Sequence, residues 1–275
     1  MASLFEDQAA GLRKLFAGAR GPATVAFAGP GDAHGGMGRN ALVAALARGL
    51  ASAGKEVLVI DEHAGADSVA AAFGARARFD LLQAVNRDVP AAQVLLRPEP
   101  SIRLLPAARA ARQHARLDAM ERRALAEWLR RLQKGVDFVL ADTADRAEAD
   151  FSPLLPQPQR IVIAVSSDGA SITEAYARMK RLAQLRDCRR FGIAILRASS
   201  AAGNRTVFAN LREVARRHLG AELDLIGGPA GQGDPDSIGQ ALAASFLDTS
   251  RQAAENGFSV AARGLQGAAA AYPVV

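Results

Sequence analysis

Apolar residues occur along this chain in short continuous runs. Seven runs have the length of a strand, and they occupy residues 24–29, 56–61, 102–107, 136–143, 160–166, 191–196 and 223–228. Segments with helical spacing of apolar residues lie between them, at about 41–54, 117–133, 171–186 and 204–218. Continuous apolar strands that alternate with helices are typical of a parallel sheet buried on both faces. The pattern predicts an α/β fold: a mostly parallel, doubly wound sheet of about seven or eight strands with helices on both faces.

The N-terminus has a different character. Residues 4–18 have the spacing of a short amphipathic helix, and the sequence RGPA at 20–23 then breaks the pattern with Gly and Pro. We therefore divide the chain into an N-terminal arm, residues 1–20, and one domain, residues 24–275.

The composition fits a cytoplasmic globular protein. Hydrophobic residues make up 49% of the 275, enough for a large core. A net charge of +6 would suit an acidic partner such as nucleic acid or anionic lipid, but the arginines are spread along the predicted helices and favour solvated faces. Cys188 is the single cysteine, so an internal disulfide or a cysteine metal cluster is excluded. The N-terminus is acidic where a signal peptide is basic, and no apolar run reaches the ~18 residues of a membrane span.

A glycine-rich loop follows the first apolar run. The sequence AGPGDAHGGMGRNALVAAL spans residues 28–46, between a predicted strand and a predicted helix. Gly35, Gly36 and Gly38 allow backbone N–H groups to turn inward toward a phosphate, and the helix N-terminus adds a positive dipole. The alternative is an ordinary tight turn between strand and helix.

Two acidic residues stand at the ends of other predicted strands. Asp61 and Asp142 would lie near the loop, because the carboxyl ends of parallel strands share one edge of a sheet. Both are candidates to hold Mg²⁺ directly or through water. The alternative is that each caps the N-terminus of a following helix.

These segments together resemble the deviant-Walker-loop ATPases of the MinD/ParA class. The stretch HGGMGRNALVAALARGLASAGKEVLVIDEHAGAD at 34–67 is similar to their phosphate loop followed by D-x-D, and DFVLADTAD at 137–145 is similar to their switch segment. Within that class the chain resembles the flagellar number regulators of the FlhG/FleN group. IRLLPAA at 102–108, SSDGASITEAYARMKRL at 166–182 and the arm motif DQAAGLR at 7–13 carry that likeness.

The chain departs from the pattern of the class at five positions. The lysine that reaches across an ATP-bound dimer is His34, and the main phosphate lysine is Arg39. The magnesium-binding hydroxyl residue is Asn40, the second acid of D-x-D is His63, and the switch glycine is Arg146. Phosphoryl transfer depends on positioning and on charge stabilisation, so these changes predict weak or absent ATP hydrolysis.

The resemblance also implies which residues would hold nucleotide, metal and partner. ATP would contact the loop and strand-end residues Gly35, Gly36, Met37, Gly38, Arg39, Asn40, Asp61 and Asp142. Mg²⁺ would use Asn40, Asp61 and Asp142, and we expect ATP and Mg²⁺ to bind weakly or not at all. A flagellar GTPase of the signal-recognition-particle type, FlhF-like, would bind the arm through Asp7, Gln8, Ala9, Leu12 and Arg13.

We therefore expect a regulator of flagellar placement or number that engages and activates such a GTPase. Other expected partners are flagellar switch or basal-body proteins, or a flagellar transcription regulator, any of which would recruit the chain to the cell pole or the inner membrane face. Two alternatives stay open: an active ATPase that cycles between monomer and ATP dimer, and a ParA-like partitioning protein that binds DNA, which the arm disfavours. The C-terminal stretch 258–275 has few large apolar residues and one arginine, so we expect little membrane binding of its own.

Overall fold

A computed structural model describes residues 21–29, 38–144, 152–155, 157–197, 201–226 and 239–248, excluding the side chains of 197, 201 and 202. The predicted arm, most of the glycine loop, Arg146 and the stretch 258–275 lie outside these ranges. None of the helices within them is long and apolar enough to span a membrane.

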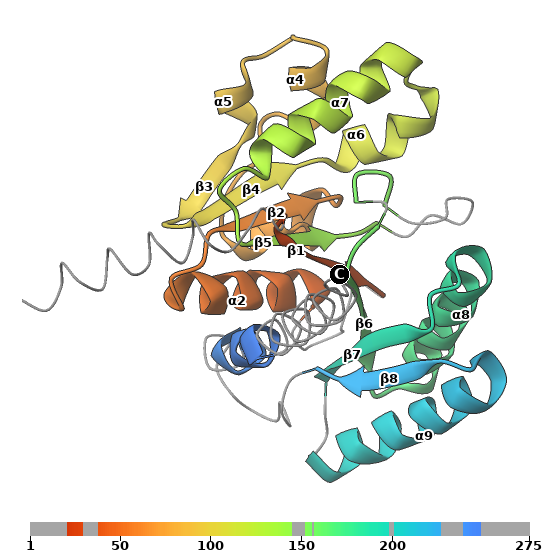
Figure 1. The fold of residues 1–275 in the computed structure, drawn as a ribbon. Coiled ribbons are helices and arrows are strands. Elements are labelled where there is room, and N and C mark those ends of the chain that lie inside the picture. The colour runs from red at the N-terminus through yellow and green to blue at the C-terminus, as the bar shows by residue number, and fades with distance from the viewer. Residues whose placement is uncertain are drawn as a thin grey trace, which may run out of the picture.

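An eight-stranded sheet organises the domain (Figure 1). Its order is β3-β4-β2-β5-β1-β6-β7-β8, and every neighbouring pair is parallel except β3 with β4. The strands are β1 Ala23–Ala28, β2 Val57–Asp61, β3 Leu96–Glu99, β4 Ile102–Pro106, β5 Phe138–Asp142, β6 Arg160–Ser166, β7 Arg190–Arg197 and β8 Glu222–Leu225. The predicted α/β class and the mostly parallel sheet are confirmed.

Helices cover both faces of the sheet. They are α2 Arg39–Ser52, α3 Val69–Ala72, α4 Leu81–Val85, α5 Ala91–Val94, α6 Ala108–Gln113, α7 Ala119–Leu132, α8 Gly169–Arg186, α9 Ala201–Leu219 and residues 239–248, with 3-10 turns η1 Gly65–Asp67 and η2 His114–Arg116. On one face α2, α3 and residues 239–248 pack in a cluster with Val25, Phe27 and Val59. On the other face α4 to α7 cover β2, β4 and β5, while α8 and α9 cover β6 to β8. Figure 1 shows α4 to α7 gathered at one end of the molecule and α8 and α9 at the other.

The seven predicted strands all form, and β3 is the strand that the pattern missed. Its sequence, LRPE, contains Pro98 and lacks an apolar run. Proline cannot donate a ladder hydrogen bond and is confined to sheet edges, which is where β3 lies. The predicted helices correspond to α2, α7, α8 and α9. Acidic caps help to start two of them: Asp118 forms a capping box with Glu121 at α7, and Asp168 accepts a hydrogen bond from Ser171 N at α8.

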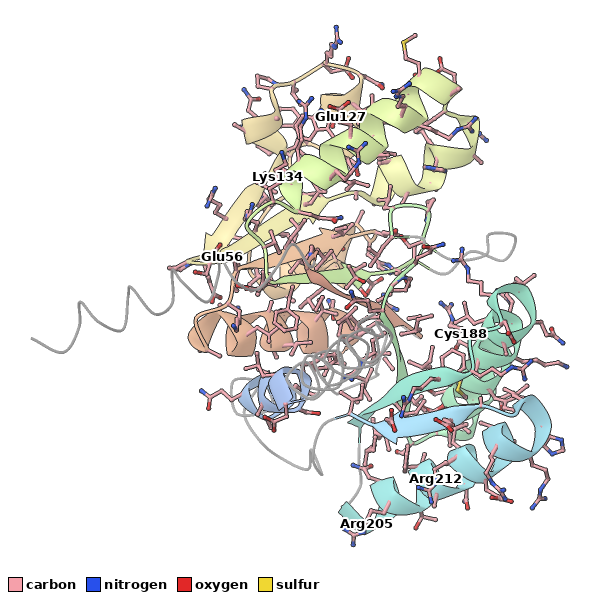
Figure 2. All side chains as sticks on the ribbon, in the orientation of Figure 1. Glu56, Glu127, Lys134, Cys188, Arg205 and Arg212 are labelled. Carbon is pink, nitrogen blue, oxygen red and sulfur yellow. The ribbon has the colours of Figure 1, made fainter. Side chains whose placement is uncertain are left out.

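The charged side chains lie mainly on the outer faces of the helices. Figure 2 shows Arg205 and Arg212 on α9, at the outside of the molecule, and both are exposed. This distribution agrees with solvated basic faces.

Two glycines allow the helix at 239–248 to cross α2 at backbone contact. A Cβ atom added to Gly49 would lie 2.2 Å from Gly239 O, and one added to Gly239 would lie 2.1 Å from Ala45 O. Leu242, Ala243 and Phe246 are thereby buried in the core. The crossing needs the absence of a side chain at both glycines.

We predict that Gly49→Ala lowers the free energy of unfolding by about 1–3 kcal/mol, because the methyl group forces the two helices apart. The control is Gly169→Ala, also in a helix, where an added Cβ meets no atom within 4 Å. Urea unfolding of both variants tests this. Equal urea midpoints of unfolding for the two variants would show that the backbones of α2 and the helix at 239–248 are not in close contact.

Candidate nucleotide site

The predicted strand-end acids lie side by side. In the sheet Asp142 is in register with both Phe27 of β1 and Asp61 of β2. Both carboxyl groups are buried, with exposed fractions of 0% for Asp142 and 1% for Asp61. The carboxyl ends of β1, β2 and β5 therefore form one polar cluster inside the domain.

Arg39 fills the centre of this cluster. It is the first residue of α2, directly after the glycine loop, and only 2% of it is exposed. Its guanidinium forms an ion pair through Nε with Asp142 Oδ1, and Nη1 donates to Gly29 O. The third nitrogen, Nη2, lies 2.6 Å from His63 Nε2. The side chain at the position of the phosphate lysine is thus bound on all three sides by the protein.

Gly29 makes this arrangement sterically allowed. It has a φ of 120°, and a Cβ atom there would lie 2.4 Å from the carbonyl oxygen of Ala164. Only glycine fits this conformation so close to β6. The turn aims the Gly29 carbonyl oxygen at the guanidinium.

His63 acts as an acceptor in the cluster. His63 Nε2 lies 2.6 Å from Arg39 Nη2, which can only donate, and 3.2 Å from Thr143 O, which can only accept. We assign the proton of the neutral imidazole to Nδ1 because the contact with Arg39 is the shorter one, so Nε2 accepts from Arg39 and makes no hydrogen bond to Thr143 O. Burial, together with the nearby Arg39, lowers the pKa of His63, while Asp142 opposes that shift. Neutral His63 can therefore pair with Arg39 without placing two cations in contact.

Asp61 is held by the backbone of the following loop. Its Oδ1 accepts from His63 N at 3.1 Å and its Oδ2 accepts from Ala70 N at 2.9 Å. Burial, and secondarily the neighbouring Asp142, raises the pKa of Asp61 to about 7 despite these hydrogen bonds. The contact with Ala70, in the first turn of α3, resembles the helix-capping alternative.

Asn40 is turned away from the acids. Its Nδ2 donates to Ala66 O at 3.2 Å and to Ser68 O at 3.3 Å, while its Oδ1 accepts from Ala41 N at 2.8 Å. The side chain therefore ties the start of α2 to the turn η1. Of the three predicted magnesium ligands, the two acids lie together and Asn40 faces this turn.

Glu62 is a buried group that the sequence did not single out. Its side chain accepts hydrogen bonds from Ser152 Oγ and, at 3.2 Å, from Ala144 N. These partners stand on either side of residues 145–151. Its place between Asp61 and His63, directly after a buried strand, was the available signal. Glu62 joins the chain before and after the segment that contains Arg146.

Several predicted site residues are not placed by the structure. His34, Gly35, Gly36, Met37 and Arg146 lie outside the described residues, as do all five predicted arm residues. Gly38 lies within the described residues as the N-cap of α2, and because it has no side chain it gives the helix no capping hydrogen bond. Within the described ranges, no group of three or more His, Cys, Asp and Glu side chains has the arrangement of a metal site.

The sheet order, with a glycine loop leading from β1 into α2, defines a P-loop NTPase fold of the MinD/ParA class. The MinC:MinD cell division complex of Aquifex aeolicus shares this fold with a TM-score of 0.57 at 21% identity, over 84% of this chain and 95% of that chain. A cobyrinic acid a,c-diamide synthase from Mycobacterium smegmatis, solved with ADP and magnesium, gives a TM-score of 0.61 at 17% identity, over 82% of this chain and 94% of that one.

The chain belongs to the family described as cellulose biosynthesis protein BcsQ, whose profile matches residues 29–185, more than half of its length. It is also similar to the antiactivator FleN of Pseudomonas aeruginosa, with 26% identity over 193 residues, which is 70% of this chain and 69% of FleN. The resemblance to the MinD/ParA class and to the FlhG/FleN group is confirmed.

We predict that Arg39→Ala lowers the free energy of unfolding by about 3–5 kcal/mol, because it leaves Asp142 buried without a counter-charge. The control Arg131→Ala breaks an exposed pair with Glu127 at 2.5 Å, and we expect almost no change. Chemical denaturation measures both. Similar small losses for the two variants would mean that Asp142 does not depend on Arg39.

Proposed function

We propose that this chain is a regulator of flagellar placement or number, of the FlhG/FleN kind, in which ATP hydrolysis is weak or lost. Its activity would lie in binding other proteins, above all a flagellar GTPase of the signal-recognition-particle type that the N-terminal arm engages and activates. The observation that carries the loss of hydrolysis is the buried Arg39–Asp142 ion pair.

In the ion pair, the guanidinium of Arg39 and the carboxylate of Asp142 compensate each other's charge. Each of the three guanidinium nitrogens contacts a different group, Asp142, Gly29 O or His63, which occupies three of its five N–H donors and holds the side chain inside the domain. To reach a nucleotide, Arg39 would have to leave a buried carboxylate unpaired, which is strongly unfavourable. The position that binds phosphate in an active loop therefore serves as an internal ion pair in this proposal.

The described side chains are a poor fit to a magnesium ion. Asp142 Oδ2 is buried and has no hydrogen-bond partner, so a single oxygen of that carboxylate is free. The Arg39 guanidinium stands against the same carboxyl group and would repel a divalent cation. Both oxygens of Asp61 accept backbone N–H groups, and Asn40 Oδ1 accepts from Ala41 N. Magnesium demands near-octahedral oxygen ligands, and this set offers few.

The similarity to FleN and the arm motif support the flagellar role. FleN is named an antiactivator, and its match covers 70% of this chain. The motif DQAAGLR at 7–13 adds a chemical reason, because Gln8 carries an amide able to orient a water molecule in the active site of a GTPase. Leu12, one helical turn along, would supply an apolar anchor on the same face.

The family profile favours a second candidate, a role in cellulose synthesis, because the matched family is described by that process. The profile covers residues 29–185 and leaves out the arm. Deleting the encoding gene separates the two candidates. Altered flagellar number with normal cellulose supports the flagellar role, and the reverse result supports the second candidate.

We predict that phosphate release from ATP by the natural chain is no faster than by the Asp142→Ala variant. The reason is that Arg39 already neutralises Asp142, and His63 stands where an acid would orient water. A folded Asp142→Ala control, checked by circular dichroism, sets the background. Magnesium-dependent turnover that Asp142→Ala abolishes would overturn the claim of lost hydrolysis.

We predict that the full chain accelerates GTP hydrolysis by the flagellar GTPase and that the chain lacking residues 1–20 does not. Gln8→Ala should remove the acceleration and keep most of the binding, whereas Leu12→Ala should weaken the binding itself. Calorimetry and phosphate release distinguish the two effects. Equal acceleration with and without residues 1–20 would refute the arm as the docking element.

A further inference from the structure

A cavity lies beside the ion pair, on the side of the sheet order away from β1. It has a volume of about 580 Å³ and opens where β2 and β4 end, with Asp61 and Pro106 in its lining. Its walls come from residues within 63–83, which end in α4, and from α6. Arg39 and Asp142 are absent from its lining, because they lie toward β1 and β5 in the sheet order. The volume falls within the range of small-molecule pockets, roughly 300–1,000 Å³.

Three arginines line this cavity: Arg76, Arg78 and Arg109. All three are exposed, and their guanidinium groups make no ion pair or hydrogen bond with any residue that the structure describes. Arg78 does lie over the ring of Phe79, with 6.0 Å between Cζ and the ring centroid. Free guanidinium forks bind carboxylate or phosphate oxygens in pairs.

The acidic groups of the lining do not compete for these arginines. Asp80 is buried, and its Oδ1 accepts from Leu82 N and Ala110 N, each at 3.0 Å. Its Oδ2 accepts from Arg109 N at 2.8 Å. Asp61 is the other acid in the lining, and both of its carboxylate oxygens likewise accept hydrogen bonds from backbone N–H groups.

Asp80 also fixes the walls relative to one another. By capping α4 and holding the backbone of α6, it sets the segment that carries Arg78 against the helix that carries Arg109. Arginines from two segments are thereby placed at one opening before a ligand arrives. A preorganised site loses less conformational freedom on binding.

The rest of the lining is mostly small and apolar. Seven alanines contribute, together with Phe79 and Pro106. Such a surface suits the uncharged body of a ligand, while the arginines suit its anionic groups.

We propose that this cavity binds a small organic anion that carries a phosphate or carboxylate group, with that group held by Arg76, Arg78 and Arg109 and its apolar body resting on the alanines. The cavity adjoins the Arg39 cluster, since Asp61 and His63 belong to both, but the three arginines lie outside that cluster. The proposed site depends neither on ATP hydrolysis nor on the N-terminal arm.

The test uses anilinonaphthalene sulfonate, a fluorescent apolar anion, titrated into the full chain. We expect saturable binding that weakens about tenfold or more in Arg109→Gln and in Arg78→Gln, because each loses a charge-assisted contact. Arg112→Gln removes the same charge from the same helix outside the lining and should bind almost normally. Ala71→Trp, at an exposed lining position, should block the cavity.

Competition then identifies the anionic group. Displacement by pyrophosphate and ADP assigns a phosphate ligand, and displacement by citrate assigns a carboxylate. The proposal is overturned if binding is not saturable, if Arg112→Gln weakens it as much as Arg109→Gln, if Ala71→Trp leaves it intact, or if no competitor displaces the dye.

Discussion

The buried ion pair between Arg39 and Asp142 is the constraint on which the polar end of this sheet depends. Asp142 is fully buried, and a carboxylate in that environment needs a counter-charge. Arg39 supplies that charge from the first turn of α2, and this fixes where the helix starts relative to β5. The ion pair also requires the neutral form of His63 and the unusual turn at Gly29, because both provide acceptors for the same guanidinium.

This arrangement changes what the P-loop fold can do. A ligand shifts a conformational equilibrium only by binding one state better than the other. Under the proposed function, the cation beside Asp142 is the Arg39 side chain, which is present in every state of the chain, so binding or release of a ligand cation at this carboxylate would not act as a switch. Glu62 adds to the effect, since it joins Ala144 and Ser152 on both sides of residues 145–151. Under the proposed function, partners and small ligands would act on the chain through other sites, and the cavity beside β4 is the proposed site for a small anion.

Much of the fold follows from patterns that are legible in the sequence. Continuous apolar runs identified seven strands, since a strand buried on both faces must be apolar throughout. The short edge strand β3 was not predicted, because it is only partly buried and contains Pro98, so its sequence has no continuous apolar run. The strand-end position of Asp61 and Asp142 was predictable from chain order. The partners of Arg39 were not, because a long side chain can point to solvent, to a ligand or inward, and only the packed geometry decides.

The cavity arginines could not be recognised from the sequence either. Arg76, Arg78 and Arg109 are separated by up to 33 positions and belong to a chain rich in exposed arginines. What distinguishes them is the geometry of Asp80, an acid in the same lining whose oxygens accept backbone N–H groups and not these guanidinium groups. At the Arg39 cluster the opposite holds, because the acid there is paired with an arginine side chain. A strand-end acid paired with an arginine side chain and a helix-capping acid bound by backbone N–H groups thus accompany a closed site and an open one.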